Sequence, residues 1–136
     1  MDRQRVPVTS NWGETIGYSR AVRAGDMVFV SGTTASGPDG KALHPGNPGA
    51  QASVIFERIA AALRELGAAA QDVVETRIYL TDMTAWQEVG RAHGQMFGQT
   101  RPATTMVQVG PLVAHDLLVE IAVTAIVGGP SSASGP

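Results

Sequence analysis

The sequence predicts an α+β domain in which a mixed β-sheet carries two helices packed on one face. Short apolar runs of strand type lie towards both ends of the chain, and two segments with helical spacing lie between them, which gives the order ββαβαββ. The 136 residues are 43% hydrophobic, enough for one core and little for a second. Residues 1–128 are therefore expected to form a single domain, and the small, polar tail 129–136 is expected to be disordered.

The first two strands are predicted within residues 15–33, on either side of a turn at Gly25 and Asp26. Met27 to Val30 is an apolar run, and a Gly-Asp pair suits a tight hairpin. Residues 34–49 are dense in Gly and Pro, which interrupt both helix and sheet. We expect a long loop after the hairpin.

The first helix is predicted from about Pro48 to Leu66. Apolar side chains recur at helical spacing along this segment. Asn47 can accept hydrogen bonds at the N-terminus, and Gly67 is a typical C-terminal stop. This helix has start and stop signals at both ends.

The next predicted elements are a half-buried strand over residues 73–80 and a second helix. Alternation in VVETRIYL is expected to place four side chains on one face, namely Val74, Thr76, Ile78 and Leu80. Thr84 and Gln87 match a capping box, and an apolar stripe that includes Trp86 continues to Phe97. The second helix is expected to end at Gly98.

Two closing strands are predicted at Ala103–Val109 and Leu117–Val127. Apolar side chains occur at both odd and even positions of the last strand, so both of its faces avoid water. Two helices can cover only one face of the sheet. We therefore expect the other face to meet another copy of the chain in a homo-oligomer.

Composition excludes several classes of function and site. The chain has no cysteine, so disulfides, a thiolate nucleophile and a Cys-ligated zinc site are excluded, and the cytoplasm is the expected location. Its net charge of −2 and single lysine argue against a nucleic-acid partner. The apolar run needed for a signal or membrane span is absent, and the three histidines share no ligand spacing, so neither membrane association nor a metal is predicted.

Glu120 is the most informative polar residue, because it interrupts an otherwise uncharged strand where an isolated carboxylate is costly to bury. Such an acid is a candidate for catalysis, and an interface salt bridge or an exposed edge position is the alternative. Ser31 and Gly32 end the second strand and can equally form a simple turn. Tyr18 can orient a ligand by its hydroxyl or serve as a core aromatic with one edge in contact with water. His93 lies on the apolar stripe and is interpreted as a core histidine.

Four segments together resemble the Rid family of reactive intermediate deaminases, also called YjgF-like proteins. These segments are GDMVFVSGT, LRELGAAAQDVVETRIYLTDM, RPATTMVQVGPL and VEIAVTA, and the resemblance extends from about Tyr18 to Val127. It implies a chorismate-mutase-like fold and a homotrimer with clefts between subunits. In the best-known branch it also implies hydrolysis of reactive enamine and imine intermediates, without a cofactor.

The resemblance also implies site residues. The family's Pro-Ala-Arg-Ser/Thr motif holds a substrate carboxylate, and a glutamate on the last strand handles water. Here Pro102 and Ala103 match the motif, and the other matching positions are Glu120, Tyr18, Ser31 and Gly32. Thr104 stands where the motif has arginine and is followed by Thr105. A hydroxyl cannot supply the charged fork that grips a carboxylate, and Arg101 is expected to have the opposite strand parity.

Three functions remain open at this level. The first is a cofactor-independent hydrolase of a small enamine, imine or carbonyl compound, with Glu120 as general base and Thr104 and Thr105 as hydrogen-bond donors. The second is a trimer that binds a small molecule without catalysis, which the missing arginine favours. The third is the ribonuclease or translation inhibitor activity attributed to some relatives, against which the acidic charge balance argues.

Overall fold

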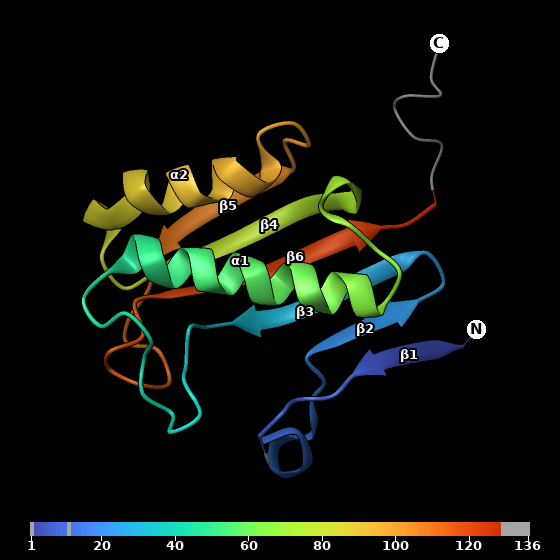
Figure 1. Cartoon of the computed structure of the whole chain (residues 1–136), viewed down its shortest axis with the longest axis horizontal. Helices are drawn as coiled ribbons and strands as arrows, with labels where there is room; N and C mark the ends of the chain where they lie inside the picture. Colours follow the sequence, from blue (N-terminus) through green and yellow to red (C-terminus); the bar gives the residue numbers. More distant parts are fainter. Residues whose placement is uncertain (1, 11, 129–136) are drawn as a thin grey trace.

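The computed structural model describes residues 2–10 and 12–128, which form one six-stranded mixed sheet with two helices on one face (Figure 1). The strand order is β1-β2-β3-β6-β4-β5. The elements are β1 (Arg3–Val6), β2 (Ala21–Ala24), β3 (Met27–Thr33), α1 (Pro48–Glu65), β4 (Val73–Leu80), α2 (Trp86–Phe97), β5 (Ala103–Gln108) and β6 (Val119–Ile126). The α+β class is confirmed, whereas the tail at 129–136 lies outside the described residues.

The N-terminal part differs from the prediction in two respects. A first strand, β1, was missed, and it pairs antiparallel with β2 at the edge of the sheet. Residues 15–17, expected to begin a strand, instead belong to a helical turn over Gly13–Gly17. The predicted turn is confirmed, because Gly25 has a φ of 62° between β2 and β3.

Helix α1 follows the sequence signals closely. The Asn47 side chain accepts a hydrogen bond from the backbone N–H of Ala50 at 3.0 Å, as an N-cap does. Gly67 has a φ of 77°, a left-handed conformation that follows many helix ends. The buried Gln51 connects α1 to a distant loop, because it accepts from the N–H of Leu118 at 2.9 Å.

Strand β4 has the predicted bounds, and its faces differ from the prediction only at Val73 and Val74. The register against β6 shifts between Val73 and Glu75, so Val73 is buried while Val74 is 44% exposed. A bulge of this kind places two residues opposite one and exchanges the expected faces of the residues before it. Thr76, Ile78 and Leu80 still face the helices and are buried as predicted.

The predicted capping box of α2 is wrong. Asp82, not Thr84, accepts hydrogen bonds here, because the N–H and the hydroxyl of Thr84 both donate to its Oδ1. A short 3-10 turn over Met83–Ala85 then leads into α2, whose first residue Trp86 is exposed rather than buried. The apolar stripe begins one turn later, at Val89.

The two faces of the sheet have different surroundings. On the helix side, odd residues of β6 join α1 and α2 in one buried core. The opposite face, called the open face below, has no covering helix in the described structure (Figure 1). It exposes large apolar side chains, among them Met27, Phe29, Val107 and Ile126.

Candidate functional site

A cavity of about 600 Å³ lies over the open face, where β3, β6 and β4 run side by side. This is within the range of small-molecule sites. The open-face side chains of Glu120, Ala122, Arg77 and Tyr79 line it, together with Phe29 and the Ser31-Gly32 segment of β3. The loop after β5 closes one side with Val109, Gly110, Pro111 and Leu112.

Glu120 lies directly against Gly32 of β3. A Cβ built on Gly32 would overlap Oε2 of Glu120, so a larger residue there would force the carboxylate to move. The β3–β6 register shifts between Val30 and Thr33, which places Ser31 and Gly32 in a bulge. The structure therefore brings three predicted site residues together in one cavity: Ser31, Gly32 and Glu120.

The Arg20 guanidinium holds this bulge by hydrogen bonds. Its Nη2 donates to Ser31 Oγ and, at 2.6 Å, to the carbonyl oxygen of Gly32. Ser31 Oγ donates in turn to the carbonyl oxygen of Arg20 at 3.0 Å. Burial lowers the pKa of Arg20, while the nearby Tyr18 and Glu120 raise it. Ser31 thus holds the bulge in place as well as lining the cavity.

Tyr18 lies beside the cavity rather than in its wall. Its backbone N–H donates to the carbonyl oxygen of Gly13 and ends the helical turn there. The next residue, Ser19, lines the cavity, and Tyr18 is close enough to Arg20 to influence its pKa. Tyr18 is 38% exposed and lies outside the buried core.

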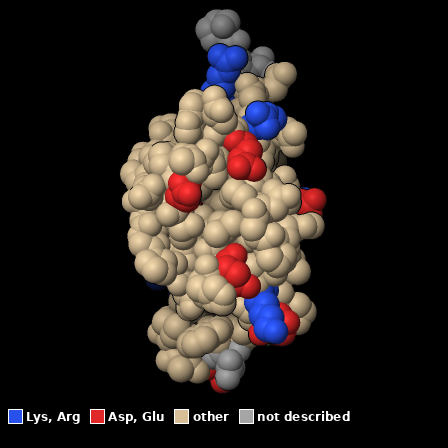
Figure 2. All heavy atoms as spheres, turned by 90° about the vertical axis from the view of Figure 1, so that its left-hand side faces the viewer, with Lys and Arg blue, Asp and Glu red and all other residues tan. Residues whose placement is uncertain are grey.

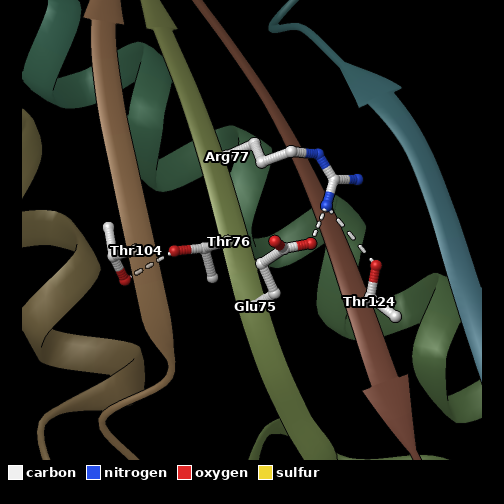
Figure 3. Close-up of polar contacts among 5 residues, drawn as sticks. All are labelled: Glu75, Thr76, Arg77, Thr104 and Thr124. Atoms are coloured by element: carbon white, nitrogen blue, oxygen red, sulfur yellow. Dashed lines mark hydrogen bonds and ion pairs between the residues drawn. The ribbon is translucent and has the colours of Figure 1, made fainter.

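Thr104 does not share a face with Glu120 within one chain. The parallel register pairs Thr104 with Thr76, and their hydroxyl oxygens lie 2.8 Å apart on the helix side (Figure 3). Thr104 also donates to the carbonyl oxygen of Pro102 at 3.1 Å. Thr105 pairs with Arg77 and so lies on the open face, but it does not line the cavity.

His93 completes the polar cluster around Thr104. Its Nε2 lies 2.9 Å from Thr76 Oγ1 and 3.4 Å from Thr104 Oγ1. The ring packs edge to face against Phe56, with centroids 5.7 Å apart, and is tilted against Phe97. Burial lowers the pKa of His93. His93 is thus hydrogen-bonded but only half-buried, at the margin of the core.

We expect His93 to make the protein sensitive to acid. Its pKa is lower in the folded chain than the value of 6.5 for a free side chain, so below that pH the unfolded chain binds the extra proton more readily. The free energy of unfolding should therefore fall as the pH drops below about 6.5. Urea unfolding between pH 7.5 and 5 should show this fall.

A His93→Gln variant should lose part of this pH dependence, because its amide does not titrate. His115 is exposed, so His115→Gln is the matched control and should keep the wild-type slope. An unchanged slope in His93→Gln would show that other groups cause the acid sensitivity.

Arg101 does not replace the motif arginine within its own chain. It has a φ of 53°, and its Nε donates to the carbonyl oxygen of Gly98 at 3.2 Å, at the end of α2. The guanidinium thus lies at the helix terminus and not at the open-face cavity. The predicted difference in direction from Thr104 is consistent with this geometry.

The sequence analysis missed two residues that line the cavity, Arg77 and Tyr79, and one that supports its wall, Arg20. Arg77 and Tyr79 follow Glu75 on the polar face of β4, and this alternation was a usable signal. Arg20 had no comparable signal, because its role depends on the bulge in β3.

Among the described residues, no three His, Asp or Glu side chains gather as metal ligands. Within the same part of the chain, no helix has the length and apolarity to span a membrane.

Comparison with known proteins identifies relatives over most of the chain. The family model described as "Endoribonuclease L-PSP" matches residues 10–127. The crystal structure of Rv2704 from Mycobacterium tuberculosis, a member of the YjgF/YER057c/UK114 family, is 46% identical and superposes with a TM-score of 0.84. It covers 93% of this chain and 100% of its own.

Two curated relatives extend this comparison. The uncharacterized protein SCO2049 of Streptomyces coelicolor is 37% identical over 95% of this chain and 96% of its own length. The 3-aminoacrylate deaminase RutC of Acinetobacter baylyi is 34% identical over 77% of this chain and 82% of its own. With the family model matched over nearly the whole domain, the chain belongs to the Endoribonuclease L-PSP family, also known as the YjgF or Rid family.

Proposed function

We propose that this protein is a cofactor-independent hydrolase of small enamine, imine or related carbonyl compounds, and that the open-face cavity is its active site. The observation that carries this proposal is the Glu120 carboxylate, which stands over Gly32 at the wall of a 600 Å³ cavity. A relative named 3-aminoacrylate deaminase, 34% identical to this chain, supports the reaction class.

The cavity residues suggest how hydrolysis proceeds. Glu120 takes a proton from a water molecule as the water oxygen attacks the carbon of a protonated imine. The resulting tetrahedral carbon carries one hydroxyl and one amino group. Glu120 then returns its proton to the nitrogen, the C–N bond breaks, and the hydroxyl oxygen forms the carbonyl while its proton passes through Glu120 to the departing ammonia. A protonated imine and water thus give a carbonyl compound and ammonium.

We further propose that the active assembly is a homotrimer with the cavity at a subunit boundary. Large apolar side chains on the open face support an interface there, because Phe29 and Ile126 are each 43% exposed in the single chain. Edge strand β5 is also exposed along most of its length. Because the sheet separates Thr104 from Glu120 within one chain, Thr104 can reach only the cavity of a neighbouring copy.

Light scattering after size exclusion should give three times the 14.2 kDa chain mass. The physical reason is the apolar open face, which is costly to leave in water. A monomer at micromolar concentration would contradict the intersubunit site, and with it the assignment of Thr104 to a ligand cleft.

A non-catalytic binding trimer is the second candidate. One observation favours it specifically: the Thr104 hydroxyl already bonds to Thr76 and to the carbonyl oxygen of Pro102. A threonine engaged in this way neither replaces the motif arginine nor offers a free donor. In this alternative the cavity binds a stable carbonyl compound, and Glu120 acts as a hydrogen-bond acceptor.

Ribonuclease activity, which the family's printed description suggests, has less support. The net charge is −2, and a nucleic-acid partner normally requires a basic surface. On the face drawn in Figure 2, the Lys and Arg side chains lie towards its upper and lower ends, and acidic side chains lie between these two ends. We therefore do not propose an RNA substrate.

A substrate screen separates hydrolysis from binding. Imines and enamines are generated in situ by amino-acid oxidases and dehydratases, and ammonia or carbonyl release is followed with and without the purified protein. Acceleration of at least one compound supports the hydrolase. Binding of carbonyl compounds in the cavity without acceleration of any imine would support the second candidate instead.

A further inference from the structure

We propose that Arg77 forms an anion subsite in the open-face cavity, and that the ligand is a small oxo or imino acid whose carboxylate is separated from the reacting carbon by at least one further carbon. The assignment of the reacting end to Glu120 rests on the proposed function. The anion subsite itself requires only that the cavity binds a ligand.

Arg77 and Glu120 line the same cavity, but the pairing of β4 with β6 places them at different positions along the strands. Arg77 is opposite Ala122, whereas Tyr79 is opposite Glu120, and all four residues line the cavity. One two-residue repeat therefore separates the two charged residues along the sheet, roughly 7 Å. Ala122 lies on the same face between Glu120 and Thr124, and its small side chain leaves room above β6.

The Arg77 guanidinium points away from Glu120. Its Nη1 donates to Glu75 Oε1 and, at 3.4 Å, to Thr124 Oγ1, so the group extends over β6 (Figure 3). Thr124 lies beyond Ala122 when β6 is followed from Glu120. Hence the positive charge is directed away from the proposed base, and Arg77 lines the cavity while its partners Glu75 and Thr124 do not.

Arg77 retains the capacity to bind a ligand. Its side chain is 35% exposed and that of Glu75 is 49% exposed, and ion pairs in such surroundings are weak. Among the described residues, Nε and Nη2 of Arg77 make no hydrogen bond. Glu75 therefore orients the guanidinium, while one edge of its planar fork remains able to grip a carboxylate.

The charges at the two ends of the cavity determine the orientation of a ligand. Arg77 attracts a carboxylate, and Glu120 repels one, so an oxo or imino acid binds with its carboxylate at Arg77. The cavity walls also include Val22 and Phe29, which suit a short carbon chain. A 2-imino acid carries its carboxylate on the reacting carbon, so it cannot reach Arg77 while that carbon is at Glu120.

Equilibrium binding tests this subsite without any turnover. The probes are 4-oxopentanoate and 2-pentanone, which have the same carbon skeleton and carbonyl position and differ in whether a carboxylate or a methyl group ends the chain. Wild type should bind 4-oxopentanoate about tenfold or more tightly than 2-pentanone, because a hydrogen bond to a charged group is worth at least one such factor. The preference should disappear in Arg77→Gln and persist partly in Arg77→Lys.

Arg91→Gln is the matched control, since Arg91 is exposed on helix α2, on the other side of the sheet from the cavity. It should keep the wild-type preference. Circular dichroism and size exclusion establish that each variant is folded and assembled. Equal affinity for both probes, no binding of 4-oxopentanoate in the millimolar range, or a preference that survives in Arg77→Gln would overturn the proposal.

The test of the anion subsite and the test of the proposed hydrolase have separate outcomes. Should no imine be hydrolysed while 4-oxopentanoate still shows the Arg77-dependent preference, the anion subsite stands and the hydrolase does not. Pyruvate, whose carboxylate adjoins the carbonyl, serves as a third probe. Its binding should change less than that of 4-oxopentanoate when Arg77 is replaced, and a larger change would contradict the assigned spacing.

Discussion

Replacing Glu120 with Gln is expected to reduce any imine hydrolysis by about 10²- to 10⁴-fold, the usual contribution of general acid–base catalysis. Glutamine keeps the length and shape of the side chain beside Gly32 but cannot take a proton from water. The rate of ammonia release from the best substrate, measured for wild type and Glu120→Gln, provides the test.

Glu65→Gln is a suitable control, because Glu65 is exposed at the end of α1, on the other side of the sheet. It should turn over substrate at the wild-type rate, and both variants should elute as wild type does. Unchanged activity in Glu120→Gln would show that Glu120 is not the catalytic base and has a structural role instead.

The second large effect is expected from Thr104→Arg on 2-aminoacrylate. Wild type should hydrolyse this compound slowly, because Thr104 offers no charged fork for a carboxylate attached to the reacting carbon. An arginine there should raise kcat/KM about tenfold to a hundredfold, the effect of roughly 1.5 to 3 kcal/mol for a charge-assisted hydrogen bond. Pyruvate release, with 2-aminoacrylate supplied by a serine dehydratase, measures it.

Gln87→Arg is a suitable control, because it adds the same charge at an exposed position of helix α2, away from the open face. It should leave the slow wild-type rate unchanged. Efficient wild-type turnover of 2-aminoacrylate would mean that another cationic group anchors the carboxylate, and Arg101 of a neighbouring copy would then be the first candidate. No gain in an assembled Thr104→Arg protein would show that Thr104 does not face a neighbour's cavity.

Much of the fold could be predicted because local signals and packing agree. Asn47 and Gly67 mark both ends of α1, and alternation marks β4. The errors occurred where a contact between distant segments overrides the local pattern. In the described structure, β1 forms by pairing with β2. The bulge at Val73 and Val74 arises from the pairing of β4 with β6. The periodicity of a single segment cannot reveal either pairing.

The candidate site was predictable to a smaller extent. Glu120 was identifiable because a carboxylate inside an apolar strand needs an explanation, and the structure places it at the cavity. The sequence could not show that Thr104 and Glu120 lie on opposite faces, since this separation follows from the parallel pairing of β5 with β4. The support that Arg20 gives to Gly32 depends on a bulge, and the direction of Arg77 depends on Glu75 and Thr124.

The most direct test of the open-face cavity as the ligand site is a crystal structure of the assembled protein with 4-oxopentanoate. The ligand carbonyl should lie against Glu120 and Gly32, its carboxylate should contact Arg77, and strand β5 of a neighbouring subunit should close the cavity. A ligand bound instead in the pocket between α1 and α2 that Phe56 and Met96 line, or an open-face cavity filled by side chains of the neighbouring subunit, would contradict this account.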